Sequence, residues 1–396
     1  MHLLKNMSHL LGGILLVAGT SIGVGMLALP VATAEGGFLP SVLVYIVCWL
    51  FMLCTGLLIL ECCLWMPKGA NLTTLASRLL GKGGTILCWI TYLYLFSCLM
   101  IAHVTAGGHS INQFFFNALP FSLSSLIYIT LFAPFVYLGA KWVDRINLIL
   151  MLGVISTYII FVGGGIQEIN FKLLSHMNWA KAWLPLPLVF TAFGYQGLIP
   201  TLLTHLDRNV SKVRICLFFG TLIPLFIYVI WEFLVLGIVP LEGDFGLLEA
   251  FKKGENAIAP LIRFTNHSYL SLVGQYFAFF TMTTSMFGLS IAFIDFLIDG
   301  LKLKGKKFQK TTPFLIVFVL PMLVSWVDPE IFLTALNYAG GYGVALLLGA
   351  MPILMVWRGR YTFKFGTKME QLKGGKITLF LLFVFVLFEI YLQIKS

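Results

Sequence analysis

The strongest constraint on this sequence is that apolar runs of about 20 residues recur along its whole length. The hydrocarbon core of a bilayer is about 30 Å thick, and a helix needs about 20 apolar residues to cross it. The composition fits a membrane protein, because 59% of the residues are hydrophobic and only 11% are charged. The runs are continuous, whereas a transmembrane β-barrel shows segments of about ten residues that alternate in polarity. The sequence therefore predicts an all-α polytopic membrane protein.

Eleven of these runs are long enough to be membrane spans. The expected ranges are 9–33, 38–65, 84–115, 123–140, 146–163, 182–205, 215–239, 269–298, 313–327, 330–357 and 377–394. The longest outer loop, 240–268, contains Leu247, Leu248 and Phe251 at a spacing that fits one face of a short helix. A simple surface loop is the other interpretation of this segment.

The formal net charge of +10 is explained by membrane topology rather than by nucleic-acid binding, because the charged residues gather between the apolar runs. With the N-terminus in the cytoplasm, 20 of the 26 lysines and arginines fall in cytoplasmic loops. Such an excess is typical of cytoplasmic loops. We therefore expect a cytoplasmic N-terminus and a periplasmic C-terminus. The seven cysteines lie inside apolar runs at spacings that fit no zinc or haem site, so no metal is expected.

Helix-breaking residues interrupt two spans near their midpoints. The first span contains "GTSIGVGMLALP" (19–30), in which Gly19, Gly23 and Gly25 surround the midpoint, and the sixth contains "FTAFGYQGLIP" (190–200). Such glycines can also serve close helix packing. Two interrupted spans at one depth, however, are the best sequence indication of a transporter's binding site.

The two interrupted spans are five spans apart and run in opposite directions. This arrangement is typical of an inverted repeat of five plus five helices. We expect a ten-helix transport core at 1–357, with repeats at 9–163 and 182–357. A cytoplasmic loop and an eleventh helix follow at 358–396.

Unwound backbone at membrane depth is tolerated only where it lines a cavity or is buried in protein. The outer half of span one begins near Gly23, where free N–H groups and the positive end of the helix dipole suit a carboxylate. The first half of span six ends near Phe193, where free carbonyl groups suit an ammonium group. A zwitterionic amino acid matches both ends.

Several motifs resemble the hydroxy and aromatic amino acid permease family, within the amino acid–polyamine–organocation superfamily. They are "GTSIGVGMLALPVA" (19–32), "LECCLWMPKGANLTTLASRLLGKGG" (60–84), "FTAFGYQGLIPTLL" (190–203) and "TSMFGLSIAFIDFLIDGL" (284–301). The resemblance implies a LeuT-like fold with broken helices 1 and 6. It also implies proton-driven uptake of tyrosine or tryptophan across the bacterial inner membrane.

Two departures from the family pattern bear on the choice among tyrosine, tryptophan and phenylalanine. His103 stands where the pattern has a tyrosine, and Gln196 stands where some relatives have a histidine. Contacts with aromatic side chains would favour an aromatic substrate by roughly 1 kcal/mol each. The expected substrate-binding residues are Thr20, Ser21, Gly23, Val24, Gly25, His103, Phe190, Phe193, Gly194, Tyr195, Gln196, Asn337 and Tyr338.

Ionisable residues at membrane depth are functional candidates by default. His103 fits a proton carrier or a partner for a substrate hydroxyl, or else a histidine bonded to a neighbouring carbonyl. Glu61 fits either a structural ion pair with a loop arginine or lysine, or a role in coupling, and Glu232 is a similar case. Thr284 and Ser285 match a Thr/Ser pair that helps to bind sodium in related transporters. Proton and sodium coupling both stay open on residue chemistry, and the resemblance favours protons.

The sequence thus predicts a secondary-active symporter of aromatic amino acids that works by alternating access and needs no cofactor and no catalytic residue. A sodium-coupled carrier of other neutral amino acids is the nearest alternative. A membrane-embedded lipid enzyme is more remote, because the seven histidines form no cluster.

Overall fold

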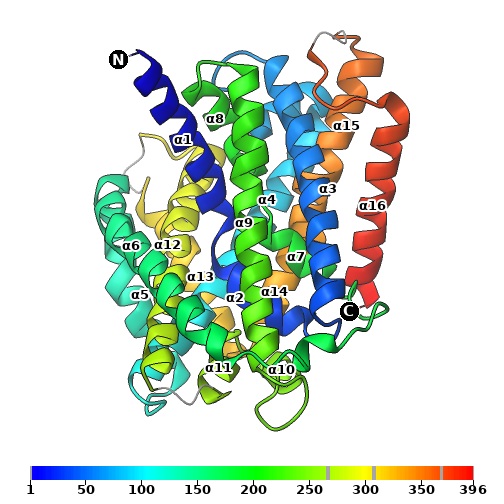
Figure 1. Cartoon of the computed structure of the whole chain (residues 1–396). Helices are drawn as coiled ribbons and strands as arrows, with labels where there is room; N and C mark the ends of the chain where they lie inside the picture. The colour runs from blue at the N-terminus through cyan, green and yellow to red at the C-terminus, as the bar shows by residue number, and fades with distance from the viewer. Residues whose placement is uncertain (1, 265–267, 306–308, 366–368, 396) are drawn as a thin grey trace.

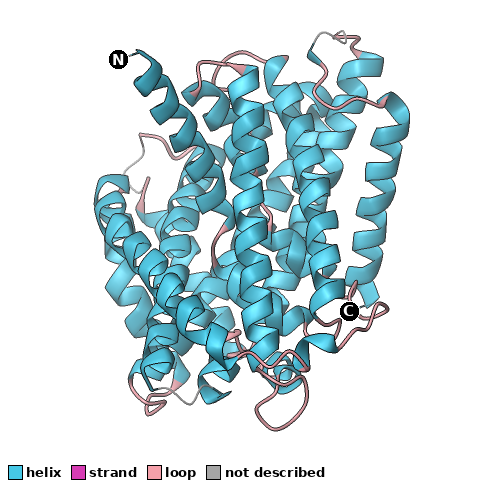
Figure 2. Ribbon diagram, viewed as in Figure 1, coloured by secondary structure: helices cyan, strands magenta, loops and turns pink. Residues whose placement is uncertain are grey.

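The computed structural model describes residues 2–264, 268–305, 309–365 and 369–395. These residues form a bundle of long helices joined by loops, with the N-terminus at one end of the bundle and the C-terminus toward the other (Figures 1 and 2). The α-helices are α1 (His2–Ser21), α2 (Val24–Thr33), α3 (Phe38–Leu64), α4 (Leu72–Phe114), α5 (Phe121–Leu138), α6 (Ala140–Gly165), α7 (Leu186–Ala192), α8 (Ile199–His205), α9 (Val210–Ile238), α10 (Leu247–Lys252), α11 (Ile258–Phe264), α12 (Ser268–Gly300), α13 (Thr311–Val327), α14 (Phe332–Tyr338), α15 (Met351–Trp357) and α16 (Gly375–Lys395).

The expectation of an all-helical membrane protein is confirmed. Within the described residues, nine helical segments are long and apolar enough to cross a membrane, and the bent pair formed by α1 and α2 makes a tenth. The helix α13 is apolar but has only 17 residues, so the count of eleven spans stays a prediction.

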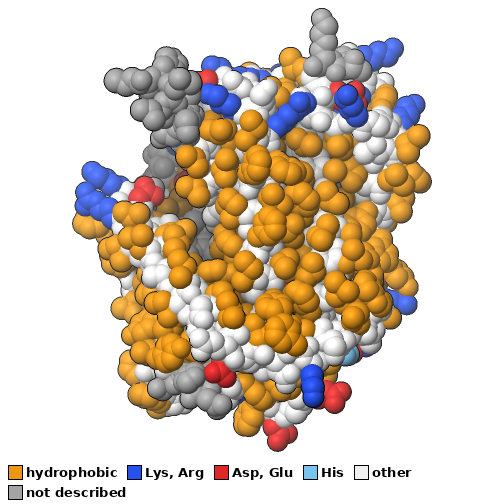
Figure 3. Space-filling view, in the orientation of Figure 1, with side chains coloured by type: hydrophobic (Ala, Val, Ile, Leu, Met, Phe, Trp, Pro, Cys, Tyr) orange, Lys and Arg blue, Asp and Glu red, His pale blue; other side chains and the backbone are white. Residues whose placement is uncertain are grey.

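A band of hydrophobic side chains covers the middle of the molecule, and most lysine and arginine side chains in this view lie toward the end where the N-terminus is (Figure 3). On α6, for example, Leu148, Ile149 and Leu152 are 62–70% exposed, as expected for side chains that face lipid. The basic residues Lys306, Lys307 and Lys368, which contribute to the expected charge asymmetry, lie outside the described residues.

Asparagine caps fix the starts of two long helices. Asn71 accepts a hydrogen bond from the amide of Thr74 at 2.9 Å, and Asn209 accepts one from Lys212 at 3.1 Å. The helix α4 therefore starts about a dozen residues earlier than the predicted span at 84–115. The backbone of Gly81, at φ 75° and ψ −160°, is not helical and divides α4 into two parts, and the predicted span covers the second part.

Spans one and six are interrupted where the sequence indicates. The helix α1 ends at Ser21 and α2 begins at Val24, with an angle of 51° between them, and α7 and α8 are separated by residues 193–198. The helices α2 and α7 pack against each other. A Cβ atom at Gly25 would lie 3.0 Å from the Cα atom of Ala192, so the missing side chain allows this approach.

Span ten contains an unusual element. Between α14 and α15 lies a π-helix, η4 (Ala339–Ala350). This form is rare in proteins overall, and where it occurs it is often at a functional site. Gly340 lies against the carbonyl oxygen of Pro187, and the Thr191 hydroxyl donates to the Leu336 carbonyl at 2.8 Å. These contacts fix the first half of span six to span ten.

The loop at 240–268 is partly helical. The helix α10 forms where the sequence left a helix and a simple loop both open, and it buries Leu247 while Phe251 stays 49% exposed. The amide of Ala257, just before α11, donates to the carbonyl of Leu27 in α2 at 2.8 Å. This segment therefore lies against α2, the second half of span one.

Candidate functional site

The breaks of spans one and six meet at a buried tyrosine of α9. The hydroxyl oxygen of Tyr228 lies 2.6 Å from the carbonyl oxygen of Ser21 and 2.8 Å from that of Ala192. These two carbonyls end α1 and α7, where a helix leaves acceptors without intrahelical donors. A hydroxyl has a single hydrogen, so Tyr228 donates to one carbonyl at a time. The other carbonyl can accept from a further donor.

The start of α2 faces the same region with groups of the opposite polarity. Gly23 is the N-cap residue, and the amides of Val24 and Gly25 have no acceptor inside α2, as in the first turn of any helix. The Ser285 side chain of α12 lies so close to Gly23 that a Cβ atom there would collide with its hydroxyl. Glycine is therefore required for this approach.

Two further hydroxyl groups are buried in spans one and eight. The side chains of Ser21 and Thr281 are 6% and 1% exposed, and neither hydroxyl has a hydrogen-bond partner among the described residues. The Thr284 hydroxyl, by contrast, donates to the carbonyl of Thr281 at 3.0 Å. Polar groups thus remain available beside the interrupted backbone.

Side chains of the segment after α7 fix the second break to α3. The Tyr195 hydroxyl donates to the carbonyl of Met52 at 3.2 Å. The Gln196 amide donates to the same carbonyl at 3.2 Å and to the Thr55 hydroxyl at 3.1 Å. Both predicted binding residues are therefore already engaged with protein groups, while Gly194 lies between them and α7.

The predicted phenylalanines Phe190, in α7, and Phe193, just after it, have different surroundings. The Phe193 ring meets that of Tyr228 edge to face, with centroids 5.1 Å apart, so it lies at the breaks. The Phe190 ring stacks on Phe51 of α3 at 5.1 Å and contacts Phe385 of α16. Phe190 therefore packs on α16.

The remaining predicted binding residues are spread over three helices. Thr20 is exposed and donates to the carbonyl of Leu16 at 2.6 Å. On α4, His103 is 3% exposed, with Nδ1 2.7 Å from the carbonyl oxygen of Leu99 and no partner for Nε2 among the described residues. Asn337 and Tyr338 end α14, and Tyr338 is 45% exposed.

Glu61 forms a buried ion pair. Its two oxygens accept from Nε and Nη2 of Arg360, each at 2.7 Å, and the amide of Gln371 adds a bond at 2.9 Å. The side chains of Glu61 and Arg360 are 0% and 6% exposed. Arg360 also pairs with Glu370 at 2.7 Å. Of the two roles expected for Glu61, the ion pair is present, and its partner is Arg360. The bond from Gln371 also joins the end of α3 to the segment before α16.

Glu232 has a different environment. It is completely buried on α9, one helical turn from Tyr228. Its oxygens lie 2.6 Å from the Thr33 hydroxyl and 2.7 Å from the Tyr45 hydroxyl. Among the described residues, no lysine, arginine or histidine forms an ion pair with it. Thr33 ends α2 and Tyr45 belongs to α3, so Glu232 connects both helices to α9.

Sequence reasoning missed Tyr228, Thr33, Tyr45 and a second buried carboxyl, Glu389. Tyr228 precedes Glu232 by four residues, a spacing that places both on one face of α9. Glu389 is an acidic residue inside an apolar span, and the rule that indicates Glu232 applies to it equally. Thr33 and Tyr45 carried no signal of their own.

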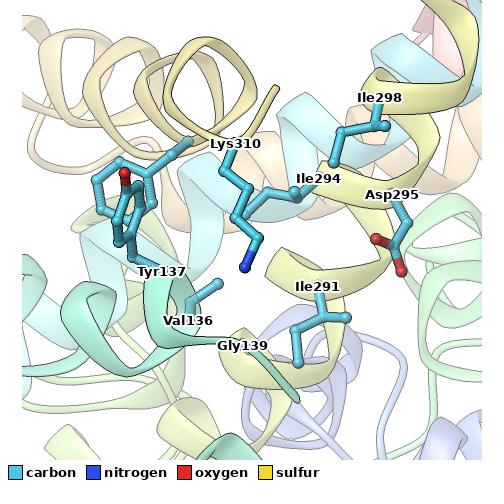
Figure 4. Close-up of a pocket in the computed structure, with 9 residues that line it drawn as sticks. Val136, Tyr137, Gly139, Ile291, Ile294, Asp295, Ile298 and Lys310 are labelled. Atoms are coloured by element: carbon cyan, nitrogen blue, oxygen red, sulfur yellow. The ribbon is translucent and has the colours of Figure 1, made fainter. Parts of the chain in front are cut away.

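A separate surface pocket of about 210 Å³ lies between α5, α12 and the start of α13. Figure 4 shows the Lys310 side chain reaching between residues of α5 and the isoleucines Ile291 and Ile294 of α12. None of its lining residues belongs to the breaks of spans one and six. No group of three potential metal ligands occurs among the described residues.

Comparison with known proteins agrees with this architecture. Residues 6–393 match the tryptophan/tyrosine permease family. The tryptophan-specific transport protein of Haemophilus influenzae is 29% identical, over 98% of this chain and 96% of its own length. The tyrosine-specific transport system 1 of the same organism is 27% identical, over 96% and 94%.

A solved structure also shares the fold. It is a manganese transporter of Eremococcus coleocola, in complex with an aromatic bis-isothiourea-substituted compound, with a TM-score of 0.61 and 14% identity over 97% of this chain and 86% of that one. Together with the two interrupted spans and the nearly full-length sequence match, this likeness confirms the LeuT-like fold expected from the sequence. The chain belongs to the tryptophan/tyrosine permease family.

Proposed function

We propose that this protein is a symporter that carries an aromatic amino acid, tyrosine or tryptophan, into the cytoplasm together with a proton, by alternating access. The observation that carries the proposal is the meeting of two helix breaks of opposite polarity. The carbonyl groups of Ser21 and Ala192 both lie at the Tyr228 hydroxyl, and the amino end of α2 lies beside them. The relatives are named as transporters of tryptophan and of tyrosine, and this supports an aromatic side chain on the substrate.

The substrate's ammonium group takes the place of the missing donor at the two carbonyls that share the Tyr228 hydrogen. Its carboxylate binds the free amides of Val24 and Gly25, where the helix dipole favours negative charge. The ring of the substrate lies beside Phe193, the residue of the predicted aromatic pocket that lies at the helix breaks. The remaining predicted residues, His103, Phe190, Tyr195, Gln196, Asn337 and Tyr338 among them, complete or shape that pocket.

A count of hydrogens supports Glu232 as the proton-binding residue. The Thr33 hydroxyl lies 2.8 Å from the carbonyl oxygen of Leu29 and 2.6 Å from Oε1 of Glu232, yet it has one hydrogen to donate. A proton on Oε1 satisfies both contacts, because Glu232 then donates to Thr33 and Thr33 donates to Leu29. Tyr45 continues to donate to Oε2. Protonation of Glu232 would thus complete a network at the end of α2.

Sodium coupling is a second candidate, favoured by the hydroxyls beside Gly23. Ser285 lies against Gly23, and the hydroxyls of Ser21 and Thr281 are buried without partners among the described residues. Hard cations prefer such oxygen ligands. Thr284 already bonds to backbone and contributes less.

We place the protein in the bacterial inner membrane with its N-terminus in the cytoplasm and its C-terminus in the periplasm. The charge distribution supports this orientation. We assign the ten-helix core to residues 1–357, with repeats at 9–163 and 182–357, and the remaining loop and helix to 358–396.

The test is uptake by the purified, full-length protein in proteoliposomes. Tyrosine, tryptophan and serine are compared under an imposed pH gradient and under an imposed sodium gradient. We expect accumulation of tyrosine or tryptophan, driven by the pH gradient and greater than that of serine. Accumulation driven only by sodium would overturn proton coupling, and the absence of amino-acid accumulation under either gradient would overturn the proposed function.

A further inference from the structure

Glu389 of α16 is the most unusual buried group outside the site described above. Its side chain is 0% exposed, and neither carboxyl oxygen has a hydrogen-bond partner among the described residues. Buried polar groups are nearly always hydrogen-bonded, and each exception calls for a physical explanation. An ionised carboxyl without a partner inside a membrane protein is costly and usually marks a functional position.

The residues around Glu389 show that it faces the bundle rather than lipid. Val386 lies against Gly349, and Gln393 lies against Gly341, so this side of α16 packs on η4. The neighbouring helices α7 and α15 contain no charged residue. The titratable side chain of η4, Tyr342, packs on Tyr94 and Tyr338 instead.

The titratable neighbour of Glu389 is Cys48 of α3, which interacts with it electrostatically. Cys48 also interacts electrostatically with Tyr45, three residues earlier on the same face of α3. The Tyr45 hydroxyl in turn donates to Oε2 of Glu232 at 2.7 Å. All four side chains are 0% exposed. Each of the two buried carboxyls therefore has a titratable neighbour on α3, Tyr45 for Glu232 and Cys48 for Glu389.

We propose that Glu389 is a second proton-binding residue, so that α16 takes part in coupling. This inference rests on the proposed proton-driven transport. The step is a simple protonation: the carboxylate takes a proton from the outer solution and returns it to the cytoplasm, and no other bond changes.

The first test observes the proton directly. Infrared difference spectra of the full-length protein between mildly acidic and mildly alkaline buffer report the carbonyl band of protonated carboxyl groups. We expect Glu389→Gln to remove one component of this band, and Glu249→Gln, at an ion pair on the exposed face of α10, to leave it unchanged. A band unaltered by Glu389→Gln would overturn the proposal, whether or not the protein transports aromatic amino acids.

The second test uses transport. In proteoliposomes, Glu389→Gln should lower the accumulation of substrate driven by a pH difference of about one unit by up to about tenfold, the factor for one lost proton. Substrate exchange without a gradient should continue, and Glu389→Asp should restore accumulation. Normal accumulation by Glu389→Gln would overturn the proposal, whereas a wild type that moves no aromatic amino acid would refute the proposed function and leave the infrared result standing.

Discussion

The three glycines of the first span invite a comparison in which each one gains a single methyl group. Gly19, Gly23 and Gly25 lie within seven residues, yet their surroundings differ. A Cβ atom at Gly19 has no heavy atom within 4 Å, whereas one at Gly25 would lie 3.0 Å from Cα and 3.1 Å from Cβ of Ala192. The contact at 3.0 Å is with the backbone of Ala192, which has little freedom to move away.

These distances set the expected magnitudes. Gly19→Ala should stabilise α1, by up to about 1 kcal/mol, because alanine is the better helix former. Gly25→Ala should destabilise the protein by about 1–3 kcal/mol, the usual range for overpacking. Gly23→Ala should act mainly on substrate binding, because it displaces the Ser285 hydroxyl beside the amides of α2.

The assay combines thermal unfolding of the detergent-solubilised protein with equilibrium binding of tyrosine and tryptophan. Ala192→Gly provides a matched rescue, since it removes the methyl group that Gly25→Ala meets. Full stability and normal affinity of Gly25→Ala would refute the close approach of α2 and α7. Loss of transport in Gly19→Ala would show that this glycine serves a role other than the one its open surroundings indicate.

Three further substitutions test the buried polar groups. Glu61→Gln should lower the free energy of unfolding by about 3–5 kcal/mol, because it leaves the Arg360 guanidinium buried without its main partner; thermal unfolding measures this, and a stable variant that has lost only coupling would contradict the structural role. Tyr228→Phe should weaken substrate binding by up to about tenfold, because the Ser21 and Ala192 carbonyls lose the hydroxyl that holds them in place; unchanged affinity in equilibrium binding would separate Tyr228 from the substrate site. Glu232→Gln should keep substrate exchange but lose accumulation driven by a pH gradient, and flux assays in proteoliposomes distinguish the two; retained accumulation would remove Glu232 from coupling.

The sequence predicts the fold well because its signals are local. Apolar runs mark the spans, and the glycines near 23 and 194 mark the breaks, since each depends only on neighbouring residues. The break at Gly81 inside α4 is local in the same way, because it depends on a positive φ that glycine adopts easily.

The site is less accessible to such reasoning because its contacts join distant parts of the chain. Tyr228 acts on Ser21, 207 residues away, and Arg360 pairs with Glu61, 299 residues away. A single sequence shows that Glu61 needs a partner but not which of many basic residues supplies it. Tyr45 and Thr33 carry hydroxyls that are common in membrane helices, and only the fold brings them to Glu232.

The ion cluster of Glu61, Arg360 and Glu370 also limits how the last helix can move. The helix α16 lies at the edge of the bundle in Figure 1, where a terminal helix is easily displaced. Its leading segment is nevertheless held to the end of α3 through Arg360, which also donates to the carbonyl of Leu372 at 2.9 Å. Sliding of α16 along the bundle would break buried charged contacts, whereas tilting about this anchored end would preserve them. A motion of α16 that keeps these contacts would be a swing about the anchored end, and it would carry Glu389 with it.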